Sequence, residues 1–231
     1  ASYNTITNND ITTKGDLGYG IHLHSSSYLT IRNNNITTSG DTGYGFHIFS
    51  SSNDNTITNN NITTTGDNAN GMYILVAYGS TITDNNITTT GPSGVGVWFS
   101  QASNHELTNN KITTTGDTGY GISLYSYAGN NIITGNNITA SGTTEGYGMR
   151  IYDYAGNNTI TNNNITSENS KIILDGIGSY TNTLIYNNSY GEVNWFNKTN
   201  LSISESGTIG LGTAINISNN SIVVDSASYN D

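Results

Sequence analysis

The sequence predicts an all-β fold of the parallel β-helix (solenoid) class, with about seven to eight coils and a C-terminal cap or tail. Three observations lead to this prediction: a repeat of about 25 residues, alternation of apolar and polar residues inside each repeat, and one asparagine that no repeat changes. The unit is clearest over 55–75, which reads NTITNNNITTTGDNANGMYIL. One such unit alone cannot bury its apolar side, whereas stacked units enclose a continuous core.

The first apolar position of each unit marks the repeat, with successive spacings of 25, 26, 25, 25, 26 and 27 residues. It is occupied by Ile6, Ile31, Ile57, Ile82, Leu107, Ile133 and Ile160. Five residues later a second column contains Ile11, Ile36, Ile62, Ile87, Ile112, Ile138 and Ile165. Both columns alternate with polar residues and neither has helical periodicity, so we expect a short strand around each.

Between the two apolar columns lies an asparagine that is present in all seven copies. It is Asn9, Asn34, Asn60, Asn85, Asn110, Asn136 and Asn163. The residue that follows varies among Asp, Asn and Lys, so it faces water and alternation directs the invariant neighbour inward. A buried amide needs hydrogen-bond partners, and the same asparagine in the coils above and below supplies them. We therefore predict an asparagine ladder inside the solenoid.

Two glycine columns separate the second strand from a third. The first contains Gly15, Gly40, Gly66, Gly91, Gly116 and Gly142, where we expect a turn with positive φ. The second contains Gly20, Gly45, Gly71, Gly96, Gly121 and Gly148. The strand that follows should bury the pairs Ile21/Leu23, Phe46/Ile48, Met72/Ile74, Val97/Phe99, Ile122/Leu124 and Met149/Ile151.

The pattern divides the chain into a β-helix over 1–187 and a cap or tail of short strands over 188–231. We expect Trp195 and Phe196 to cover the last coil, with strands near 201–204 and 215–218. The repeat is already in phase at Asn4, with no capping element before it. A first coil exposes unpaired backbone, so we expect it to dock on another copy or on other domains of a longer chain.

Composition restricts the partners and the location. The 6 basic and 16 acidic residues give a net charge of −10, which argues against nucleic acid as a partner. No apolar run is long enough to span a membrane, and the absence of cysteine leaves no disulfides. A chain rich in Thr, Asn, Ser and Gly and poor in Lys is typical of an extracellular or cell-surface protein.

Potential N-glycosylation triplets agree with that location. They begin at Asn35, Asn61, Asn86, Asn137, Asn157, Asn164, Asn187, Asn197, Asn200, Asn216 and Asn219. Those within N-I-T are generated by the repeat itself, whereas Asn197, Asn200 and Asn216 in the tail have no such origin.

The repeat resembles the right-handed β-helix repeats of the NosD-like, carbohydrate-binding and sugar-hydrolysing superfamily. The resemblance covers about 1–187 and rests on the N-x-I-x-x-N-x-I runs and the G-I/F/M-x-L/I strands. The tail, with TLIYNNSYGEVNWFNKTNLS and INISNNSIVV, is similar to the ends of repeat-bearing surface proteins of archaea. The first resemblance implies a right-handed solenoid and the second a cell envelope, while function stays open because this fold hosts enzymes, adhesins and scaffolds.

The outward positions of the third strand form an aromatic stripe. One column reads His22, His47, Tyr73, Trp98, Ser123 and Arg150, and its neighbour reads His24, Phe49, Leu75, Ser100, Tyr125 and Tyr152. Aromatic rings suit sugars, and exposed apolar patches mark contact surfaces. The stripe is therefore either a glycan-binding groove or a packing face, and we favour the packing face.

Catalytic and metal-binding chemistry have weaker support. His22, His24 and His47 should cluster, but no carboxylate or cysteine stands beside them, so we expect neither a metal nor a cofactor. Arg150 lies near Glu145 and Asp153, yet Asp153 falls at an inward phase and no second carboxylate faces it. No nucleophile elbow is present. We therefore assign no catalytic residue and do not expect an enzyme.

These observations favour a non-catalytic structural or assembly protein of an archaeal-like envelope, sheath or filament, whose partner is another copy of itself. The alternative is a carbohydrate-binding module or adhesin that uses Phe49, Tyr73, Trp98 and Tyr125. A third possibility is a polysaccharide lyase or hydrolase centred on Arg150.

Overall fold

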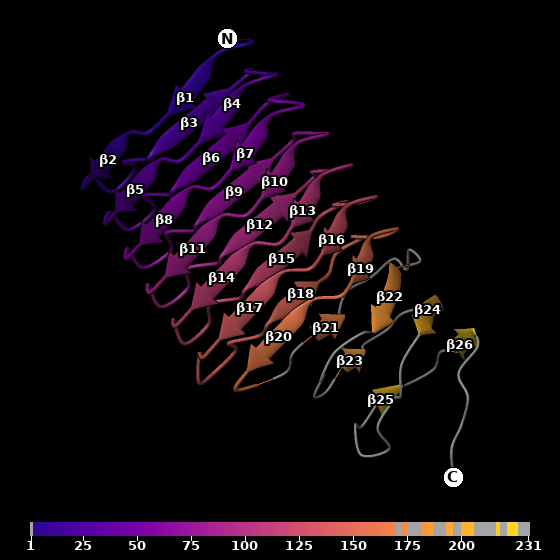
Figure 1. Cartoon of the computed structure of the whole chain (residues 1–231). Coiled ribbons are helices and arrows are strands. Elements are labelled where there is room, and N and C mark those ends of the chain that lie inside the picture. The colour runs from indigo at the N-terminus through magenta and orange to yellow at the C-terminus, as the bar shows by residue number, and fades with distance from the viewer. Residues whose placement is uncertain are drawn as a thin grey trace.

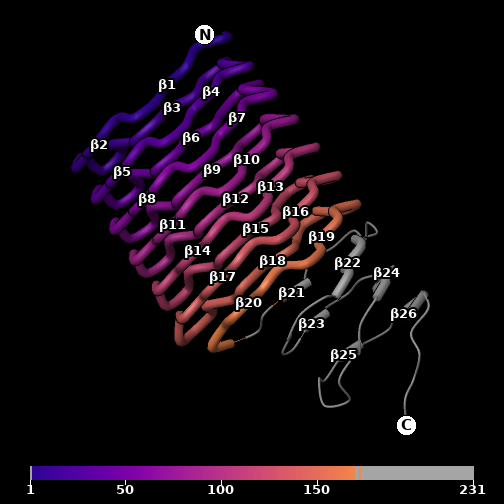
Figure 2. The backbone as a smooth tube through the Cα atoms, viewed as in Figure 1, coloured from indigo at the N-terminus to yellow at the C-terminus, as the bar shows by residue number. Residues whose placement is uncertain are grey.

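The computed structural model describes residues 2–169 and, after them, the strands at 172–174, 182–186, 193–195, 200–205, 216–217 and 221–225. Every regular element in this part of the chain is a β-strand, and the strands form a parallel β-helix (Figure 1). Each of the first seven coils, from β1 to β21, contributes one strand to each of three sheets, and the stacked turns of the backbone are visible in Figure 2. The predicted fold class is confirmed.

Three sheets run along the solenoid. The first contains β1 (Thr5–Thr7), β4 (Thr30–Arg32), β7 (Thr56–Thr58), β10 (Thr81–Thr83), β13 (Glu106–Thr108), β16 (Ile132–Thr134), β19 (Thr159–Thr161), β22 (Asn182–Tyr186), β24 (Asn200–Glu205) and β26 (Ser221–Asp225). The second contains β2 (Asp10–Thr13), β5 (Asn35–Thr38), β8 (Asn61–Thr64), β11 (Asn86–Thr89), β14 (Lys111–Thr114), β17 (Asn137–Ala140) and β20 (Asn164–Ser167). The third contains β3 (Ile21–His24), β6 (Phe46–Phe49), β9 (Met72–Leu75), β12 (Val97–Ser100), β15 (Ile122–Tyr125), β18 (Met149–Ile151), β21 (Ile172–Leu174), β23 (Val193–Trp195) and β25 (Asn216–Ile217).

All neighbouring strands pair in parallel, and equivalent positions of successive coils lie side by side. Ile31 pairs with Ile57, and Ile57 pairs with Ile82. Because coils are one strand spacing apart, about 4.8 Å, each side chain packs on its own equivalent in the next coil. The repeat therefore keeps one residue type in each inward column.

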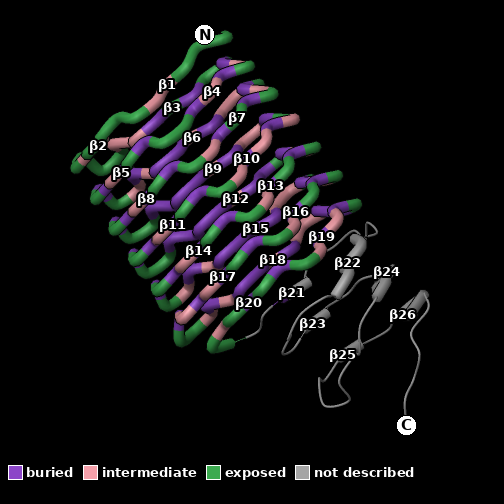
Figure 3. Tube along the Cα trace, in the orientation of Figure 1, coloured by how far each residue is buried: buried purple, intermediate pink, exposed green. Residues whose placement is uncertain are grey.

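The core is a stack of the predicted apolar columns. All of the expected inward pairs of the third sheet are buried, and Phe46 and Phe99 are its largest fully buried side chains. Buried and exposed stretches alternate along the coils formed by residues 2–169 (Figure 3). Only at the first coil are the apolar positions Ile6 and Ile11 partly exposed, because no described coil covers them.

The invariant asparagines form a hydrogen-bonded ladder between the first and second sheets. Asn60 donates from Nδ2 to the carbonyls of Ile31 and Thr58 and to Oδ1 of Asn85, at 3.0, 3.1 and 3.0 Å. Its backbone N–H also donates to Oδ1 of Asn85, at 2.9 Å. The members from Asn34 to Asn163 are at most 1% exposed, whereas Asn9 in the first coil is exposed. Each amide therefore joins its own coil to both neighbours.

The residue before each ladder asparagine makes the corner between the first two sheets. It adopts positive φ, for example 57° at Asn33 and 55° at Asn59. Asparagine tolerates this left-handed conformation better than most residues. In the recurrent Asn-Asn pair, the first residue therefore turns the chain and the side chain of the second packs inside the solenoid.

Glycine is required in the turns for a different structural reason from the one that we expected. Among the described glycines only Gly79 and Gly135 have positive φ, so the positive φ predicted for the first glycine column is wrong. A Cβ at Gly66 would overlap the carbonyl of Gly40 in the preceding coil, and one at Gly71 would lie 2.6 Å from the carbonyl oxygen of Gly96. Close approach between coils therefore requires these glycines.

A second internal ladder was not foreseen. It occupies the position before β7, β10, β13, β16 and β19 of the first sheet, at Asn55, Ser80, His105, Asn131 and Asn158. Asn131 accepts from the backbone N–H of His105 at 2.9 Å and donates to the carbonyl of Ala102 at 3.1 Å. Because this column mixes three residue types, its inward direction could not be recognised from residue identity.

In the C-terminal region the sheets continue through strands whose backbone is described. β22 pairs with β24, and β24 pairs with β26, in the direction of the earlier coils. Trp195 ends β23, whereas Phe196 lies outside the described residues. The domain boundary at 187 stays a prediction. Within the described part of the chain, no helix has the length and apolar character needed to cross a membrane.

Candidate functional site

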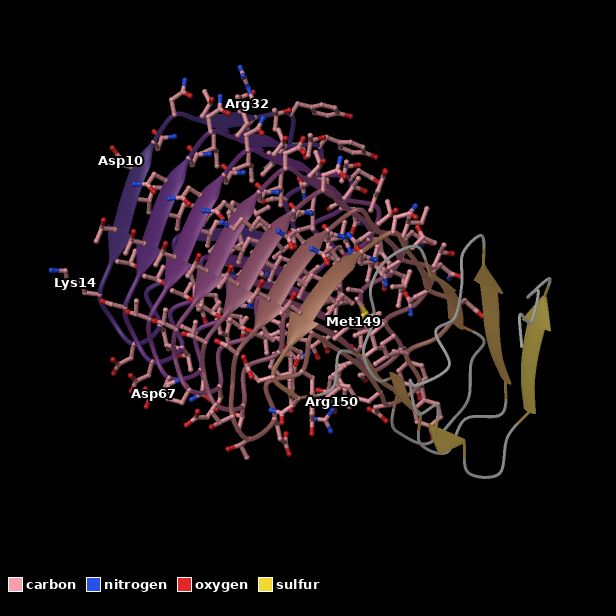
Figure 4. The ribbon with its side chains drawn as sticks, turned by 60° about the horizontal axis from the view of Figure 1, so that its bottom comes forward. Asp10, Lys14, Arg32, Asp67, Met149 and Arg150 are labelled. Atoms are coloured by element: carbon pink, nitrogen blue, oxygen red, sulfur yellow. The ribbon has the colours of Figure 1, made fainter. Side chains whose placement is uncertain are left out.

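The predicted aromatic stripe lies on the outer surface of the third sheet. His22, His47, Tyr73, Trp98, Ser123 and Arg150 occupy paired positions in consecutive strands. His24, Phe49, Leu75, Ser100 and Tyr125 form the neighbouring column, and Tyr152 follows β18. Seen in Figure 4, Met149 turns into the solenoid while its neighbour Arg150 points outward. The structure thus brings all of these residues onto one surface.

The rings of the stripe contact one another from coil to coil. The centroids of His22 and His47 are 4.8 Å apart with an interplanar angle of 12°, and those of His47 and Tyr73 are 5.6 Å apart at 3°. Trp98 continues the row, 5.1 Å from Tyr73 and 6.3 Å from Tyr125. The result is an aromatic surface that extends over at least five coils.

Four further tyrosines flank the stripe and escaped the sequence analysis. Tyr19, Tyr44, Tyr120 and Tyr147 precede the second glycine column. Tyr19 stacks on Tyr44 at 5.3 Å, and Tyr120 stacks on Tyr147 at 5.6 Å. The recurring tripeptide Gly-Tyr-Gly was the signal that could have revealed them. We call the stripe together with these four tyrosines the aromatic face.

At the later coils the aromatic face includes a charged cluster. The Tyr120 hydroxyl donates to Oε2 of Glu145 at 2.9 Å and accepts from Nη1 of Arg150 at 2.6 Å. The Arg150 guanidinium lies 4.4 Å from the centroid of the Tyr152 ring, within range of a cation–π interaction. Burial, and next the hydrogen bond to Glu145, raise the pKa of Tyr120 to about 12, so this phenol stays protonated at neutral pH.

Several buried polar atoms of the aromatic face have no hydrogen-bond partner. They are both ring nitrogens of His47, Nε1 of Trp98 and Oγ of Ser123. Burial, then the nearby His22 and His24, lower the pKa of His47 to about 4, so its ring is neutral at physiological pH. Unpaired buried polar groups destabilise a folded protein, so each one in a native structure calls for an explanation such as an ordered water, an ion or a functional role.

Predictions for the remaining site residues have mixed outcomes. The three histidines do cluster, with His22 and His24 rings 6.3 Å apart, but the described residues contain no set of three His, Cys, Asp or Glu side chains arranged to hold a metal. Asp153 does not face inward as expected: it lies in a turn with φ of 51° and is partly exposed.

The glycosylation triplets of the repeat lie on the outer surface of the second sheet. Asn35, Asn61, Asn86, Asn137 and Asn164 are exposed. Asn61 donates to Oδ1 of Asn35 at 2.8 Å, and Asn86 donates to Oδ1 of Asn61 at 2.7 Å. Asn200 and Asn216 fall in β24 and β25, whereas Asn187 and Asn197 lie outside the described residues. Glycosylation stays a prediction.

Comparison with known proteins gives one family and a group of similar structures. The family model described as "right handed beta helix region" matches residues 20–230. DFA-IIIase from Arthrobacter chlorophenolicus A6 in complex with GF2 superposes with a TM-score of 0.56 and 16% identity, over 93% of this chain and 47% of that one. The same protein in complex with DFA-III gives 0.55 and 16%, over 91% and 44%. A search of curated proteins found no match.

These findings correct the functional prediction. The chain spans about half the length of the DFA-IIIase chains, which are those of an enzyme in complex with GF2 and DFA-III. The favoured reading of the sequence, a non-catalytic structural or assembly rod, is contradicted by this similarity and is wrong. At 16% identity the similarity itself shows the fold alone.

Proposed function

We propose that the aromatic face of this chain, which belongs to the right-handed β-helix family and whose repeat resembles those of carbohydrate-binding and sugar-hydrolysing β-helix proteins, binds a carbohydrate chain. The observation that carries this proposal is the unbroken row of rings formed by His22, His47, Tyr73, Trp98 and Tyr125. Sugar rings present C–H groups that pack on aromatic faces, and a polymer contacts several rings in succession. The GF2 and DFA-III bound to DFA-IIIase agree with a ligand of this class.

The polar atoms of the aromatic face suit a ligand with many hydroxyls. Trp98 Nε1 is a donor, a neutral His47 is both a donor and an acceptor, and the Ser123 hydroxyl is both as well. None has a partner within the protein. A carbohydrate hydroxyl can both donate and accept, so it matches the hydrogen-bonding capacity of each of these groups.

Charge favours a neutral carbohydrate. Although the chain has a net charge of −10, the outward positions of β3, β6, β9, β12, β15 and β18 contain no carboxylate. Arg150, the one outward residue of these strands that is always cationic, already contacts Tyr120 and Tyr152. Glu145, which shares the Tyr120 hydroxyl with Arg150, offsets the charge of this arginine, so the binding surface is close to neutral overall.

Replacing Trp98 with alanine tests the proposal. We expect wild-type protein to bind at least one of a panel of neutral oligosaccharides (GF2 and gluco-, xylo- and manno-oligosaccharides) in isothermal titration calorimetry. Trp98→Ala should weaken this binding by about tenfold or more, since a central aromatic anchor is lost. Thr83→Ala, a partly buried outward position of the first sheet, is the matched control. Equal affinities of wild type and Trp98→Ala would reject the aromatic face as the binding surface.

A second candidate function is cleavage of the bound carbohydrate. The observation that favours it is Glu145, a carboxylate held against Tyr120 and next to Arg150 at the end of the aromatic face. A positioned carboxyl group can act as general acid or base in glycoside cleavage. Product release that Glu145→Gln abolishes and Asp67→Asn, in an exposed turn, retains would establish this activity. If the protein binds the carbohydrate but releases no product, the cleavage activity is rejected and the binding function stands.

The finer resemblances lead to a proposed location. NosD-like repeats and a tail similar to that of archaeal surface proteins support a place outside the cell, as do the glycosylation triplets. Mass spectrometry of glycopeptides from the native source tests this location. Unmodified asparagine at both Asn197 and Asn200 would count against it.

A further inference from the structure

Two consecutive coils share a turn sequence that occurs nowhere else in the chain. The sequence Tyr-Ala-Gly-Asn-Asn occurs at 127–131 and again at 154–158. The coils before them have Ser25, Ser51, Val76 and Gln101 where these two have tyrosine. The ring centroids of Tyr127 and Tyr154 are 5.1 Å apart with an interplanar angle of 10°. The repeated turn thus places a stacked tyrosine pair at the edge of the solenoid.

These two turns line a hollow of about 200 Å³. Its walls are Ser103, Tyr127, Gly129, Asn130, Tyr154, Gly156 and Asn157. Tyr127 is 57% exposed, so its ring is presented to solvent and is not absorbed into the core. The amides of Asn130 and Asn157 are exposed as well, and the glycines leave the backbone accessible. An aromatic wall beside amide donors and acceptors, with no charged lining residue, suits a neutral polyhydroxylated ligand.

The backbone holds this arrangement in place. Tyr127 and Tyr154 have φ of 64° and 65°, and Asn130 and Asn157 both have φ of 56°. The N–H of Tyr127 donates to the carbonyl of Asp153 at 3.2 Å, and the N–H of Asn130 donates to the carbonyl of Gly156 at 3.3 Å. The two turns are therefore fixed in register, so the hollow exists before any ligand arrives.

The turns that line the hollow directly follow two residues of the aromatic face along the chain. Tyr125 and Tyr152, which stack at 4.6 Å, each lie two residues before a tyrosine of the hollow. We propose that the hollow, which we call the Tyr127 pocket, is a second subsite that holds one neutral sugar ring of a chain lying on the aromatic face. This inference rests on the proposed function. The pocket is smaller than the roughly 300 Å³ at which most small-molecule sites begin, so it has room for a single ring.

The test measures the affinity of four variants for the same panel, GF2 and neutral oligosaccharides of increasing length. We expect Tyr127→Ala and Tyr154→Ala to weaken binding of the longer oligosaccharides about three- to tenfold and to leave the shortest ligands unaffected. Tyr28→Ala is the matched control, because Tyr28 is also an exposed, stacked turn tyrosine with φ of 59°. Trp98→Ala completes the set. Circular dichroism and Tm confirm that each variant folds.

The outcomes separate the two proposals. If Trp98→Ala loses binding while Tyr127→Ala and Tyr154→Ala bind every oligosaccharide like wild type, the pocket is rejected and the aromatic face stands. If the pocket variants lose binding of all lengths and Trp98→Ala does not, the aromatic face is rejected and the pocket is an independent site. No binding by wild type to any member of the panel overturns both.

Discussion

The backbone N–H of Ser80 donates a 3.1 Å hydrogen bond to Nδ1 of His105, the position at which other coils use an asparagine oxygen. Nε2 of His105 lies 2.9 Å from the carbonyl of Ala77 and must donate to it. The ring is thus the neutral tautomer with its proton on Nε2. Burial is the largest effect on this group and lowers the pKa of His105 to about 4.

This histidine makes stability depend on pH. The unfolded chain binds the proton near pH 6.5 and the folded chain only near pH 4, so stability is full above 6.5 and falls as the pH drops between these values. The loss amounts to about 3 kcal/mol of unfolding free energy. Urea denaturation of wild type and His105→Asn from pH 7 to pH 4 measures it as the difference between the two, because the pKa of His47 is lowered to about 4 as well.

His105→Asn should remove this part of the pH dependence, because asparagine reproduces both hydrogen bonds, as Asn131 does in the next coil. We expect a loss of about 1 kcal/mol at pH 7 for the smaller side chain. The gap between variant and wild type should then close or reverse towards pH 4. Parallel pH profiles would contradict the assigned tautomer.

The two neighbouring asparagines Asn85 and Asn86 should respond very differently to alanine. Asn85→Ala removes the acceptor for the backbone N–H and Nδ2 of Asn60 and the donors to two carbonyls. We expect it to lower the unfolding free energy by about 3 to 5 kcal/mol, because these buried groups lose their partners. Asn86→Ala affects an exposed residue and should change it by less than about 0.5 kcal/mol. Equal effects would show that the inner ladder is not what joins the coils.

Glycine substitutions test close packing between turns. Gly66→Ala directs a Cβ onto the carbonyl of Gly40, whereas a Cβ at Gly15, the same position of the first coil, meets nothing within 4 Å. We expect Gly66→Ala to destabilise by about 3 kcal/mol or more and Gly15→Ala to be nearly neutral. Thermal unfolding followed by circular dichroism compares the two, and a neutral Gly66→Ala would be evidence against coils stacked this closely.

The pKa of His47 reports on the aromatic face. Burial is the largest cause of the low pKa of His47, and the electrostatic effect of His22 is the second largest. His22→Ala should therefore raise the pKa of His47 from about 4 towards 6.5, because it removes a neighbouring charge and admits water. NMR titration of the imidazole protons measures this change. His105→Asn, inside the solenoid, should leave the pKa of His47 unaltered and serves as the control.

The sequence predicted most of the fold because each inward column is uniform. The invariant asparagine lies next to a position that accepts Asp, Asn or Lys, and this contrast indicates that its side chain faces inward. The isoleucine columns alternate with polar residues, which places them in the core in the same way. The ladder through Ser80 and His105 was missed because its residue types differ from coil to coil. The glycine columns were recognised, but the reason why glycine is needed there was not. That reason is the short distance between neighbouring coils, which the sequence of a single repeat does not show.

The site was predicted less completely. Alternation placed Trp98 and Tyr73 on the outer surface, yet the flanking Tyr44 and Tyr120 lie in turns, where alternation gives no direction. The contact of Tyr120 with Glu145 joins residues 25 positions apart through the stacking of turns. The balance between a packing face and a carbohydrate surface could not be decided from residue types, because both use the same rings.

Because the strands pair in parallel and in register, the length of the solenoid can change by whole coils. Deleting residues 81–105 would join Ser80 to Glu106, which pairs with Thr81 in the first sheet and so takes over its place. Each later coil would then take the place of the coil before it, with its inward and outward residues still aligned with those of its neighbours. The solenoid would be one coil shorter. The reach of its outer surface along a polymer would change by the same increment, so duplication or loss of a coil offers a simple route by which such a chain could be matched to ligands of different length.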